Sequence, residues 1–187
     1  MKLYFLTGNR HKFEQVRNAM EKLGVEIEQI KVDKPEIQAD TLEEVSRYAA
    51  EKVAAEQGKA VVVEDTGIFF EAFRNFPGVY AKFISHSLGY EGILKLLQGR
   101  KRGAYFKTVA AYAEPGKPAV LFSAETHGRI SEEVYCQDAD VMYYDRIFIP
   151  DGWNEPWCKK IAHEDYANHR KAAFVKLAEY LKKDKHK

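Results

Sequence analysis

The sequence predicts an α/β protein built around a mixed sheet. Two observations carry this prediction: apolar strands and helical patterns alternate early in the chain, and two long apolar segments joined by a Pro-Gly turn follow later. Alternation is typical of parallel strands, whereas the later pair indicates an antiparallel hairpin. With 187 residues, the chain is long enough for one domain, or for two lobes that share one core.

The early elements alternate in order. Lys2–Leu6 is a short apolar strand, and a helical stripe follows it as far as Gly24, which is well placed to end a helix. Val25–Ile30 alternates like a half-buried strand. Asp40 is predicted to cap the next helix, with Glu43 in the capping-box position. The apolar stripe of the first helix consists of Phe13, Val16, Met20 and Leu23.

The later elements follow from the same periodicities. Gly58 ends the second helix, and Ala60–Val63 is predicted to be a strand buried on both faces because its apolar run is continuous. A further helix is stopped by Gly99. Ala104–Ala113 and Ala119–His127 form the predicted hairpin. The apolar stripes of the later helices are Leu42, Val45, Ala49 and Val53, then Tyr90, Ile93, Leu94 and Leu97, and finally Phe174, Leu177, Ala178 and Leu181.

Composition excludes several classes of partner. The net charge of +1 provides no field that would attract nucleic acid or a membrane surface. No apolar run is long enough to cross a bilayer, and the opening MKLYFLTGNR is too short for a signal peptide. Cys136 and Cys158 lack CxxC spacing and are not expected to form a disulfide framework. We therefore expect a soluble protein of a reducing compartment, the cytoplasm.

The segment Thr7–Lys12, TGNRHK, lies between the first strand and the first helix. Gly8 and a helix N-terminus suit a phosphate, although neither a P-loop nor a dinucleotide fingerprint is present. Arg10, His11 and Lys12 place potential cations where the helix dipole disfavours them, and an anionic ligand would reverse that penalty. A solvated turn remains an alternative, because each such charge costs only ~0.3–1 kcal/mol.

The last helix repeats this pattern. Asn168 is a suitable N-cap, and His169, Arg170 and Lys171 follow it in the first turn. One instance is weak evidence, but two instances in one chain favour converging anion sites over coincidence.

Adjacent acids follow the strand predicted at Ala60–Val63. Glu64 and Asp65 are costly at the end of a buried strand unless they are paired or bind a metal, and Mg²⁺ prefers such oxygen ligands. Thr66 and Gly67 are predicted to form a tight turn whose N–H groups face a phosphate. A turn capped by an acid is the alternative. Elsewhere, Glu36 follows a stiff proline and is a candidate third acid.

Taken together, these motifs resemble one family. The matching segments are TGNRHK (7–12), PEIQADTLEEV (35–45), VEDTGIFFEAF (63–73), FPGVYAKF (76–83), EGILKLLQG (91–99), AYFKTV (104–109), YDRIFIPDG (144–152) and HRKA (169–172). On these segments, the sequence resembles the inosine triphosphate pyrophosphatases, also described as non-standard purine nucleoside triphosphate pyrophosphatases. The resemblance runs nearly end to end.

The resemblance implies a fold and a reaction. It implies one domain over residues 1–187, with an elongated, twisted mixed sheet flanked by helices and a deep cleft between two lobes. It implies a homodimer. It also implies Mg²⁺-dependent hydrolysis of a nucleoside triphosphate, such as ITP or XTP, to the monophosphate and pyrophosphate.

Site residues are implied position by position. Asp65 is implied to be the catalytic residue, as general base or water-orienting group, and Glu36 and Asp65 to bind Mg²⁺. The role of Glu64 stays open. The residues implied to bind substrate are Thr7, Gly8, Asn9, Lys12, Thr66, Gly67, Lys82, Tyr144, Asp145, His169 and Arg170.

The resemblance breaks where the family contacts the base. Met142 replaces a phenylalanine, Tyr143 a glycine, Arg146 a proline and Glu164 a lysine. The segments implied to bind phosphate match the family pattern, whereas the segments implied to contact the base differ from it. Altered or relaxed base preference is therefore one alternative. A nucleotide-binding protein with impaired catalysis is another. The aromatic residues placed to stack on a base in another way are Tyr143, Tyr144, Trp153 and Trp157.

Overall fold

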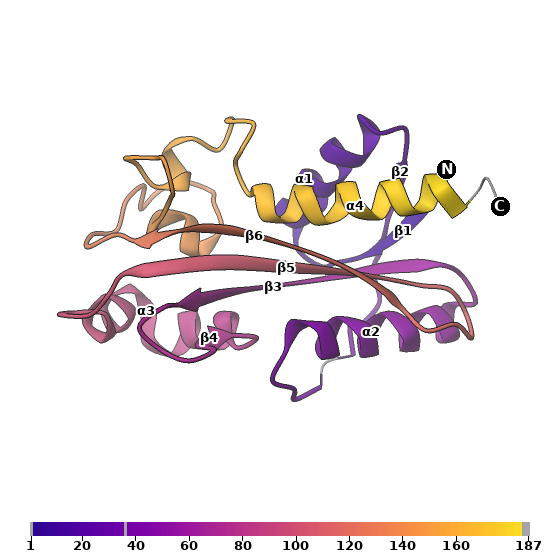
Figure 1. The fold of residues 1–187 in the computed structure, drawn as a ribbon, viewed down its shortest axis with the longest axis horizontal. Coiled ribbons are helices and arrows are strands. Elements are labelled where there is room, and N and C mark those ends of the chain that lie inside the picture. The colour runs from indigo at the N-terminus through magenta and orange to yellow at the C-terminus, as the bar shows by residue number, and fades with distance from the viewer. Residues whose placement is uncertain (1, 36, 185–187) are drawn as a thin grey trace. The chain divides into compact units, whose positions relative to one another are not determined.

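The fold is mixed α/β, as predicted (Figure 1). A computed structural model describes residues 2–35 and 37–184; Glu36, the candidate metal ligand, lies outside the described residues. Seven strands form one mixed sheet in the order β2-β1-β3-β5-β6-β7, with β4 beside β3. The strands are β1 (Lys2–Leu6), β2 (Glu26–Ile30), β3 (Val61–Phe70), β4 (Pro77–Gly78), β5 (Gly103–Ala113), β6 (Val120–Ile130) and β7 (Phe148–Pro150).

Four α-helices and two short 3₁₀ helices complete the described chain. None of the helices within 2–35 and 37–184 combines the length and the apolar character needed to cross a membrane. The α-helices are α1 (Arg10–Glu21), α2 (Leu42–Gln57), α3 (Ala81–Leu96) and α4 (Asn168–Asp184), and the 3₁₀ helices are η1 (Tyr143–Arg146) and η2 (Trp157–Lys159).

Contacts between Cα atoms divide the chain into two compact units. Unit 1 contains the chain up to Thr66, Thr108–Ala124, and the chain from His169 onward. Unit 2 contains Gly67–Lys107 and Glu125–Asn168. Strands β3, β5 and β6 each contribute residues to both units.

In unit 1, the sheet is covered on both faces. Strands β1 and β3 pair in parallel, with Phe5 opposite Val62 and Leu6 opposite Val63. Because successive side chains in a strand point to opposite faces, Phe5 and Val62 pack in the cluster with α1 and α4, whereas Leu6 and Val63 pack in the cluster with α2. Figure 1 shows the same arrangement of these helices. The predicted double burial of the third strand is confirmed.

Unit 2 has its own aromatic core. Phe106 lies edge-on to Phe148, with ring centroids 4.8 Å apart, and 5.2 Å from Trp157. These rings pack with residues of β3 and α3. Helix α3 begins earlier than its apolar stripe indicated, and Gly89 interrupts it with φ 62° and ψ −175°. The hairpin of β5 and β6 is confirmed and extends beyond the predicted His127.

The start of α2 differs by one residue from the prediction. Thr41, and not Asp40, is the N-cap: its hydroxyl accepts a hydrogen bond from the N–H of Glu44, and the Glu44 carboxylate accepts one from the N–H of Thr41. The predicted pair Asp40 and Glu43 was wrong because either register satisfies the capping-box pattern. Gly58 ends the helix in the left-handed conformation, as expected.

The tight turn predicted at Thr66 and Gly67 is wrong. Strand β3 runs without interruption from Val61 to Phe70. Its pairing with β1 stops at Val63, but it continues beside β5 and pairs with β4, where Ile68 lies opposite Gly78. Because β3 stays in the sheet as far as Phe70, Thr66 and Gly67 are strand residues and do not form a turn.

Candidate active site

The two adjacent acids of β3 point in different directions. Glu64 is buried, with 4% of its surface exposed, whereas the side chain of Asp65 is 18% exposed. Consecutive strand residues face opposite sides of the sheet, so the two carboxylates serve different environments. Both lie just beyond Val63, where pairing with β1 ends. Carboxyl ends of parallel strands are the usual ligand position in open α/β sheets.

Glu64 is the anion of a buried charge cluster. The Nζ atom of Lys12 lies 3.0 Å and the Nε atom of Arg170 lies 3.4 Å from its carboxylate oxygens. The Thr66 hydroxyl donates a hydrogen bond to the same carboxylate. Burial alone would raise the pKa of Glu64, but the two cations outweigh burial and lower the pKa to about 2. Glu64 is therefore ionised, and Lys12 and Arg170 are its counter-charges within the chain.

Two of the three potential cations in the first turn of α4, His169 and Arg170, are buried. Burial, and then the neighbouring Arg170 charge, lower the pKa of His169 well below its usual value, so this imidazole is neutral. Arg170 is 1% exposed and donates hydrogen bonds to Glu64, Gln15 and Thr66. Of the three potential cations expected in this turn, His169 is therefore neutral and Arg170 pairs with an internal carboxylate.

Asp65 is held by two groups that the sequence did not single out. Lys34 forms an ion pair with Oδ1, and the hydroxyl of Ser46 lies 3.2 Å from Oδ2. Ser46 is fully buried on α2 and also lies 3.4 Å from the carbonyl oxygen of Val109. A serine within an apolar helical stripe was a usable signal for Ser46. For Lys34, we find no comparable signal, because a lone lysine in a loop is ordinarily solvated.

The segment between β1 and α1 forms an open helix N-terminus. Asn9 is the N-cap, as its side chain accepts a hydrogen bond of 3.1 Å from the N–H of Lys12. The Thr7 hydroxyl accepts one of 3.2 Å from the N–H of Asn9. A Cβ atom built on Gly8 meets nothing within 4 Å. No acidic residue occupies the first turn of α1, so its dipole is not satisfied by a carboxylate of that turn.

The described residues do not contain a complete metal site. Within 2–35 and 37–184, no three or more His, Cys, Asp or Glu side chains are grouped so that they could hold a metal ion. Asp65 nevertheless has the chemistry of a metal ligand: it is partly accessible, and its Oδ1 already faces a cation, the ammonium of Lys34. Glu64 differs, because Lys12 and the buried Arg170 already pair with it.

Two further candidates, Gly67 and Lys82, belong to unit 2. A Cβ atom on Gly67 would lie 2.6 Å from the backbone oxygen of Gly78, so Gly67 permits the close approach of β4. Lys82 is exposed in the first turn of α3. Gly67 therefore has a packing role in addition to its proposed role at a phosphate.

The segment implied to contact the base is largely fixed by hydrogen bonds. The Tyr144 hydroxyl donates to the carbonyl of Ala81 at 2.8 Å. Asp145 is 3% exposed and accepts hydrogen bonds from the N–H of Met142 and the hydroxyl of Tyr166. Tyr144 and Trp157, expected as stacking surfaces, are 8% and 1% exposed and pack in the core of unit 2; that expectation is wrong for both.

Beside this segment lies a cavity of about 570 Å³. The rings of Tyr90 and Tyr143 stack on one another with centroids 4.1 Å apart and planes 10° apart. Burial raises the pKa of Tyr143 to about 12, and within the described chain its buried hydroxyl has no hydrogen-bond partner. The residues lining the cavity are Tyr90, Val134, Gln137, Tyr143 and Arg146. Aromatic walls with a few polar groups suit a small planar ligand.

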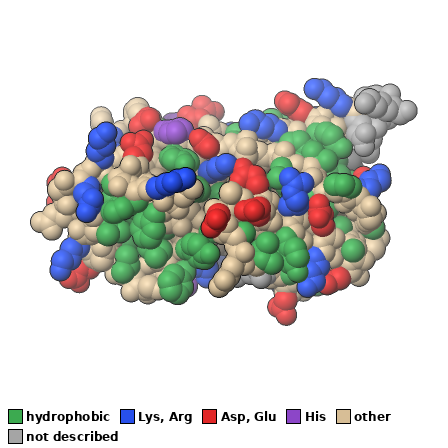
Figure 2. Space-filling model, turned by 60° about the horizontal axis from the view of Figure 1, so that its bottom comes forward, with side chains coloured by type: hydrophobic (Ala, Val, Ile, Leu, Met, Phe, Trp, Pro, Cys, Tyr) green, Lys and Arg blue, Asp and Glu red, His purple; other side chains and the backbone are tan. Residues whose placement is uncertain are grey.

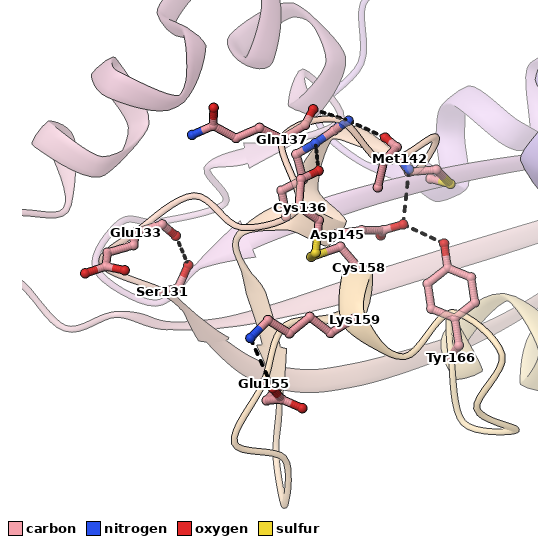
Figure 3. Close-up of a disulfide and its surroundings, with 12 residues drawn as sticks. Ser131, Glu133, Cys136, Gln137, Met142, Asp145, Glu155, Cys158, Lys159 and Tyr166 are labelled. Atoms are coloured by element: carbon pink, nitrogen blue, oxygen red, sulfur yellow. Dashed lines mark hydrogen bonds and ion pairs between the residues drawn. A yellow bond between two sulfur atoms is a disulfide. The ribbon is translucent and has the colours of Figure 1, made fainter.

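Cys136 and Cys158 form a disulfide, which corrects the expectation that no disulfide is present (Figure 3). Their Cα atoms are 6.2 Å apart although 22 positions separate them in sequence. The spacing of the two cysteines in the sequence does not indicate this pairing, because only the fold brings the loop after β6 beside η2. The expectation of a reducing compartment loses one of its premises.

The fold is that of an α/β protein with a charged cluster at the carboxyl end of β1, the position where open α/β sheets usually bind ligands. The sequence matches the profile of the Ham1 family over residues 3–180, so this chain belongs to the Ham1 family. The resemblance found in the sequence is confirmed.

Relatives and solved structures agree with this assignment. The chain is 40% identical over 184 residues to the dITP/XTP pyrophosphatase of Methanopyrus kandleri, covering 97% of each chain. It is also 40% identical to the dITP/XTP pyrophosphatase of Thermococcus kodakarensis, covering 98% of this chain and 99% of the relative. The Ham1 structure from Staphylococcus aureus superposes with a TM-score of 0.78 at 20% identity, covering 98% and 100% of the chains. That likeness concerns the fold alone.

Proposed function

We propose that this protein is a Mg²⁺-dependent nucleoside triphosphate pyrophosphatase of the cytoplasm that converts non-standard purine substrates such as ITP, dITP and XTP to the monophosphate and pyrophosphate. The names of the 40% identical relatives support the reaction class. The observation that carries the proposal for this chain is Asp65. It is a partly accessible carboxylate, held by Ser46, at the point where β3 passes the carboxyl end of β1.

The N-terminus of α1 is the proposed phosphate site. Asn9 orders the first turn, and Gly8 leaves the space beside it open, so N–H groups and the dipole can face an anion. Lys12 supplies positive charge from the same turn, although Glu64 shares it. Thr7, Thr66, Gly67 and Lys82 complete the proposed phosphate-binding set, and Tyr144, Asp145, His169 and Arg170 the proposed nucleotide-binding set.

Asp65 fits a Mg²⁺ ion better than Glu64 does. Mg²⁺ is usually held by one or two carboxylates together with substrate phosphates, and Asp65 has an accessible oxygen already facing a cation. We propose Glu36 as the second ligand. Bound there, Mg²⁺ would supply the positive charge that neutralises the phosphoanhydride as it breaks.

Asp65 would orient the attacking water and accept its proton. Ser46 fixes one carboxylate oxygen from the buried face of α2, and the other oxygen faces the ammonium of Lys34. Water attacks the phosphorus that carries the nucleoside, the phosphoanhydride bond breaks, and pyrophosphate leaves. The Glu64 cluster has a supporting role: Arg170 and Glu64 both bind the Thr66 hydroxyl and so position that residue next to Asp65.

The test is Asp65→Asn with pyrophosphate release as the measurement. The amide keeps the hydrogen bond to Ser46 but accepts no proton and is a poor Mg²⁺ ligand, so we expect a loss of ~2–4 kcal/mol of transition-state stabilisation. Asp33→Asn, an exposed acid of the loop after β2, is the matched control and should retain activity. Undiminished turnover by the Asp65→Asn protein would remove Asp65 from the mechanism.

A second candidate function is the same reaction with altered or relaxed base preference. The observation favouring it is that Tyr143 stacks on Tyr90 and that Arg146 bonds to loop carbonyls, so both departures from the family pattern are built into the structure. A panel of standard and non-standard nucleoside triphosphates tests it. Strong preference for inosine and xanthosine nucleotides would reject this candidate, and tight binding without pyrophosphate release would indicate a nucleotide-binding protein.

We also propose a homodimer, supported by exposed apolar side chains on α3 and the residue before it. Tyr80, Phe83 and Leu88 are 49%, 66% and 41% exposed, and their spacing places them near one side of the helix. Light scattering of Phe83→Glu against the exposed control Ser87→Glu tests it. A monomeric Phe83→Glu protein beside a dimeric control supports the interface, and two identical masses would place it elsewhere.

A further inference from the structure

The disulfide joins two segments of unit 2 that flank Met142, Tyr143 and Arg146, three of the residues that differ from the family pattern. Cys136 belongs to the loop between β6 and η1, and Cys158 lies in η2, with 7% of its surface exposed. Cys136 itself has a positive φ of 51°, a conformation that non-glycine residues rarely adopt without external support. Figure 3 shows the disulfide between two groups of residues: Met142 and Asp145 lie on one side of it, and Glu155 and Lys159 lie on the other.

Arg146 supports the same loop from the other side. Its Nε donates to the carbonyl of Cys136 at 3.2 Å, and its terminal nitrogens donate to the carbonyls of Ala139 at 2.6 Å and Gln137 at 3.4 Å. A further bond of 3.3 Å reaches the Tyr90 hydroxyl. Gln137 and Arg146 line the cavity beside Tyr143, so the disulfide-bonded loop forms part of the cavity wall.

On the η2 side, the contacts lead back to the same segment. Trp157, next to Cys158, lies edge-on to the ring of Tyr166 with centroids 5.8 Å apart. Tyr166 donates to Asp145, which also accepts from the N–H of Met142. Each end of the disulfide is therefore connected, through one or two contacts, to the segment 142–146. Breaking the covalent bond leaves only hydrogen bonds and ring contacts to fix the loop.

We propose that the Cys136–Cys158 disulfide is a redox-sensitive latch that sets base selectivity by fixing the wall of this cavity. This inference rests on the proposed function. A dithiol opens the latch: its thiolate attacks one sulfur, the S–S bond breaks with formation of a mixed disulfide, and the second thiolate closes the reagent's own disulfide. Two electrons and two protons are thereby transferred, and Cys136 and Cys158 become thiols.

Reduction of the disulfide should change KM for the nucleotide and leave kcat unchanged. Asp65 and the N-terminus of α1 make their contacts within unit 1, so the hydrolytic step should keep its kcat after reduction. KM for the preferred nucleotide should rise about tenfold, which corresponds to losing roughly one hydrogen bond to the base, and the ratio of kcat/KM between bases should fall by the same factor. Partial unfolding would instead lower turnover on every nucleotide equally and leave that ratio unchanged.

The experiment measures pyrophosphate release across a panel of nucleoside triphosphates with the full chain, oxidised or reduced by dithiothreitol. A thiol-reactive dye applied to the denatured protein counts free thiols in each state. The double variant Cys136→Ser, Cys158→Ser is the matched control; it should resemble the reduced protein and ignore dithiothreitol. In oxidised protein, Arg146→Met should reproduce part of the loss of selectivity.

The outcomes separate the two proposals. No free thiols before reduction, two after it, and a reduced selectivity ratio support the latch. Two free thiols in protein purified without reductant overturn it, and so does an unchanged ratio after complete reduction, while pyrophosphate release in either case leaves the proposed function standing. If the oxidised protein hydrolyses none of the nucleotides, the proposed function fails and the latch on base selectivity fails with it.

Discussion

Replacing Glu64 with glutamine removes the anion of the buried charge cluster. Lys12 and Arg170 then keep their charges with side chains only 19% and 1% exposed. Removing one partner of a buried ion pair costs roughly 3–5 kcal/mol, because the remaining charge is desolvated without compensation. We therefore expect Glu64→Gln to lower the free energy of unfolding at neutral pH by that amount.

The pKa of Glu64 gives an independent estimate of how much its ionised carboxylate stabilises the fold. The pKa of Glu64 is about 2 in the folded protein and 4.5 without the fold, and that difference, at about 1.4 kcal/mol per pH unit, is worth about 3 kcal/mol. Because the folded pKa is the lower one, this stabilisation is complete above pH 4.5 and is lost as the pH falls toward 2. The two estimates agree.

Urea denaturation at a series of pH values between neutral and about 2 measures the effect. As the pH falls below 4.5, the free energy of unfolding of the wild-type protein should decrease by about 3 kcal/mol more than that of Glu64→Gln. The two plots of unfolding free energy against pH should therefore converge in acid. Glu56→Gln, an exposed acid on α2, should follow the wild-type curve. Parallel curves for wild type and Glu64→Gln would refute the claim that Glu64 is an ionised, buried counter-charge.

Three further predictions concern stability. Thr41→Ala should lower the free energy of unfolding by about 1 kcal/mol because α2 loses its capping box, measured by thermal unfolding; a larger loss for Asp40→Ala would restore the register expected from the sequence. Gly67→Ala should cost ~1–3 kcal/mol because its Cβ would lie 2.6 Å from the Gly78 oxygen, whereas Gly8→Ala should leave stability unchanged and raise KM for the triphosphate; equal urea midpoints for these two variants would contradict the packing argument. Reducing the disulfide, which spans 22 positions, should lower the free energy of unfolding by about 3 kcal/mol, and coincident urea curves for oxidised and reduced protein would show that the bond adds nothing.

The parts of this fold that the sequence predicted are those that local pattern determines. The alternation of Phe5 and Leu6 between two apolar clusters follows from the two-residue period of a strand, and Gly58 ends α2 because only its left-handed conformation fits there. Strand β3 was predicted too short, because Glu64 and Asp65 suggested a loop. Local polarity gave no information on the cations that come to Glu64 from distant segments.

In the candidate site, too, features that depend on neighbouring residues were predicted, and features that depend on distant contacts were not. The helix N-terminus after Gly8 was predicted from neighbouring residues, and so was the need of Asp65 for a partner; in the structure α1 begins at Arg10 and Asp65 pairs with Lys34. Lys34, which pairs with Asp65 across 31 positions, and the Cys136–Cys158 bond depend on contacts that only the folded chain creates. Arg170 was expected to face a ligand, and its actual partner, Glu64, is 106 positions away.

The distance of 106 positions between Glu64 and Arg170 in the sequence has a consequence for folding during synthesis. Glu64 and Arg170 are joined only after α4 has been synthesised, 106 positions after β3. A nascent chain that ends before His169 contains the carboxylate without Arg170, one of the two cations that pair with it, and it lacks the apolar residues of α4 that cover β1. Unit 1 therefore cannot reach its native packing while the ribosome is still translating unit 2. Until α4 has been synthesised, the face of β1 that α4 covers stays exposed. Exposed apolar surface of this kind is a surface that chaperones protect.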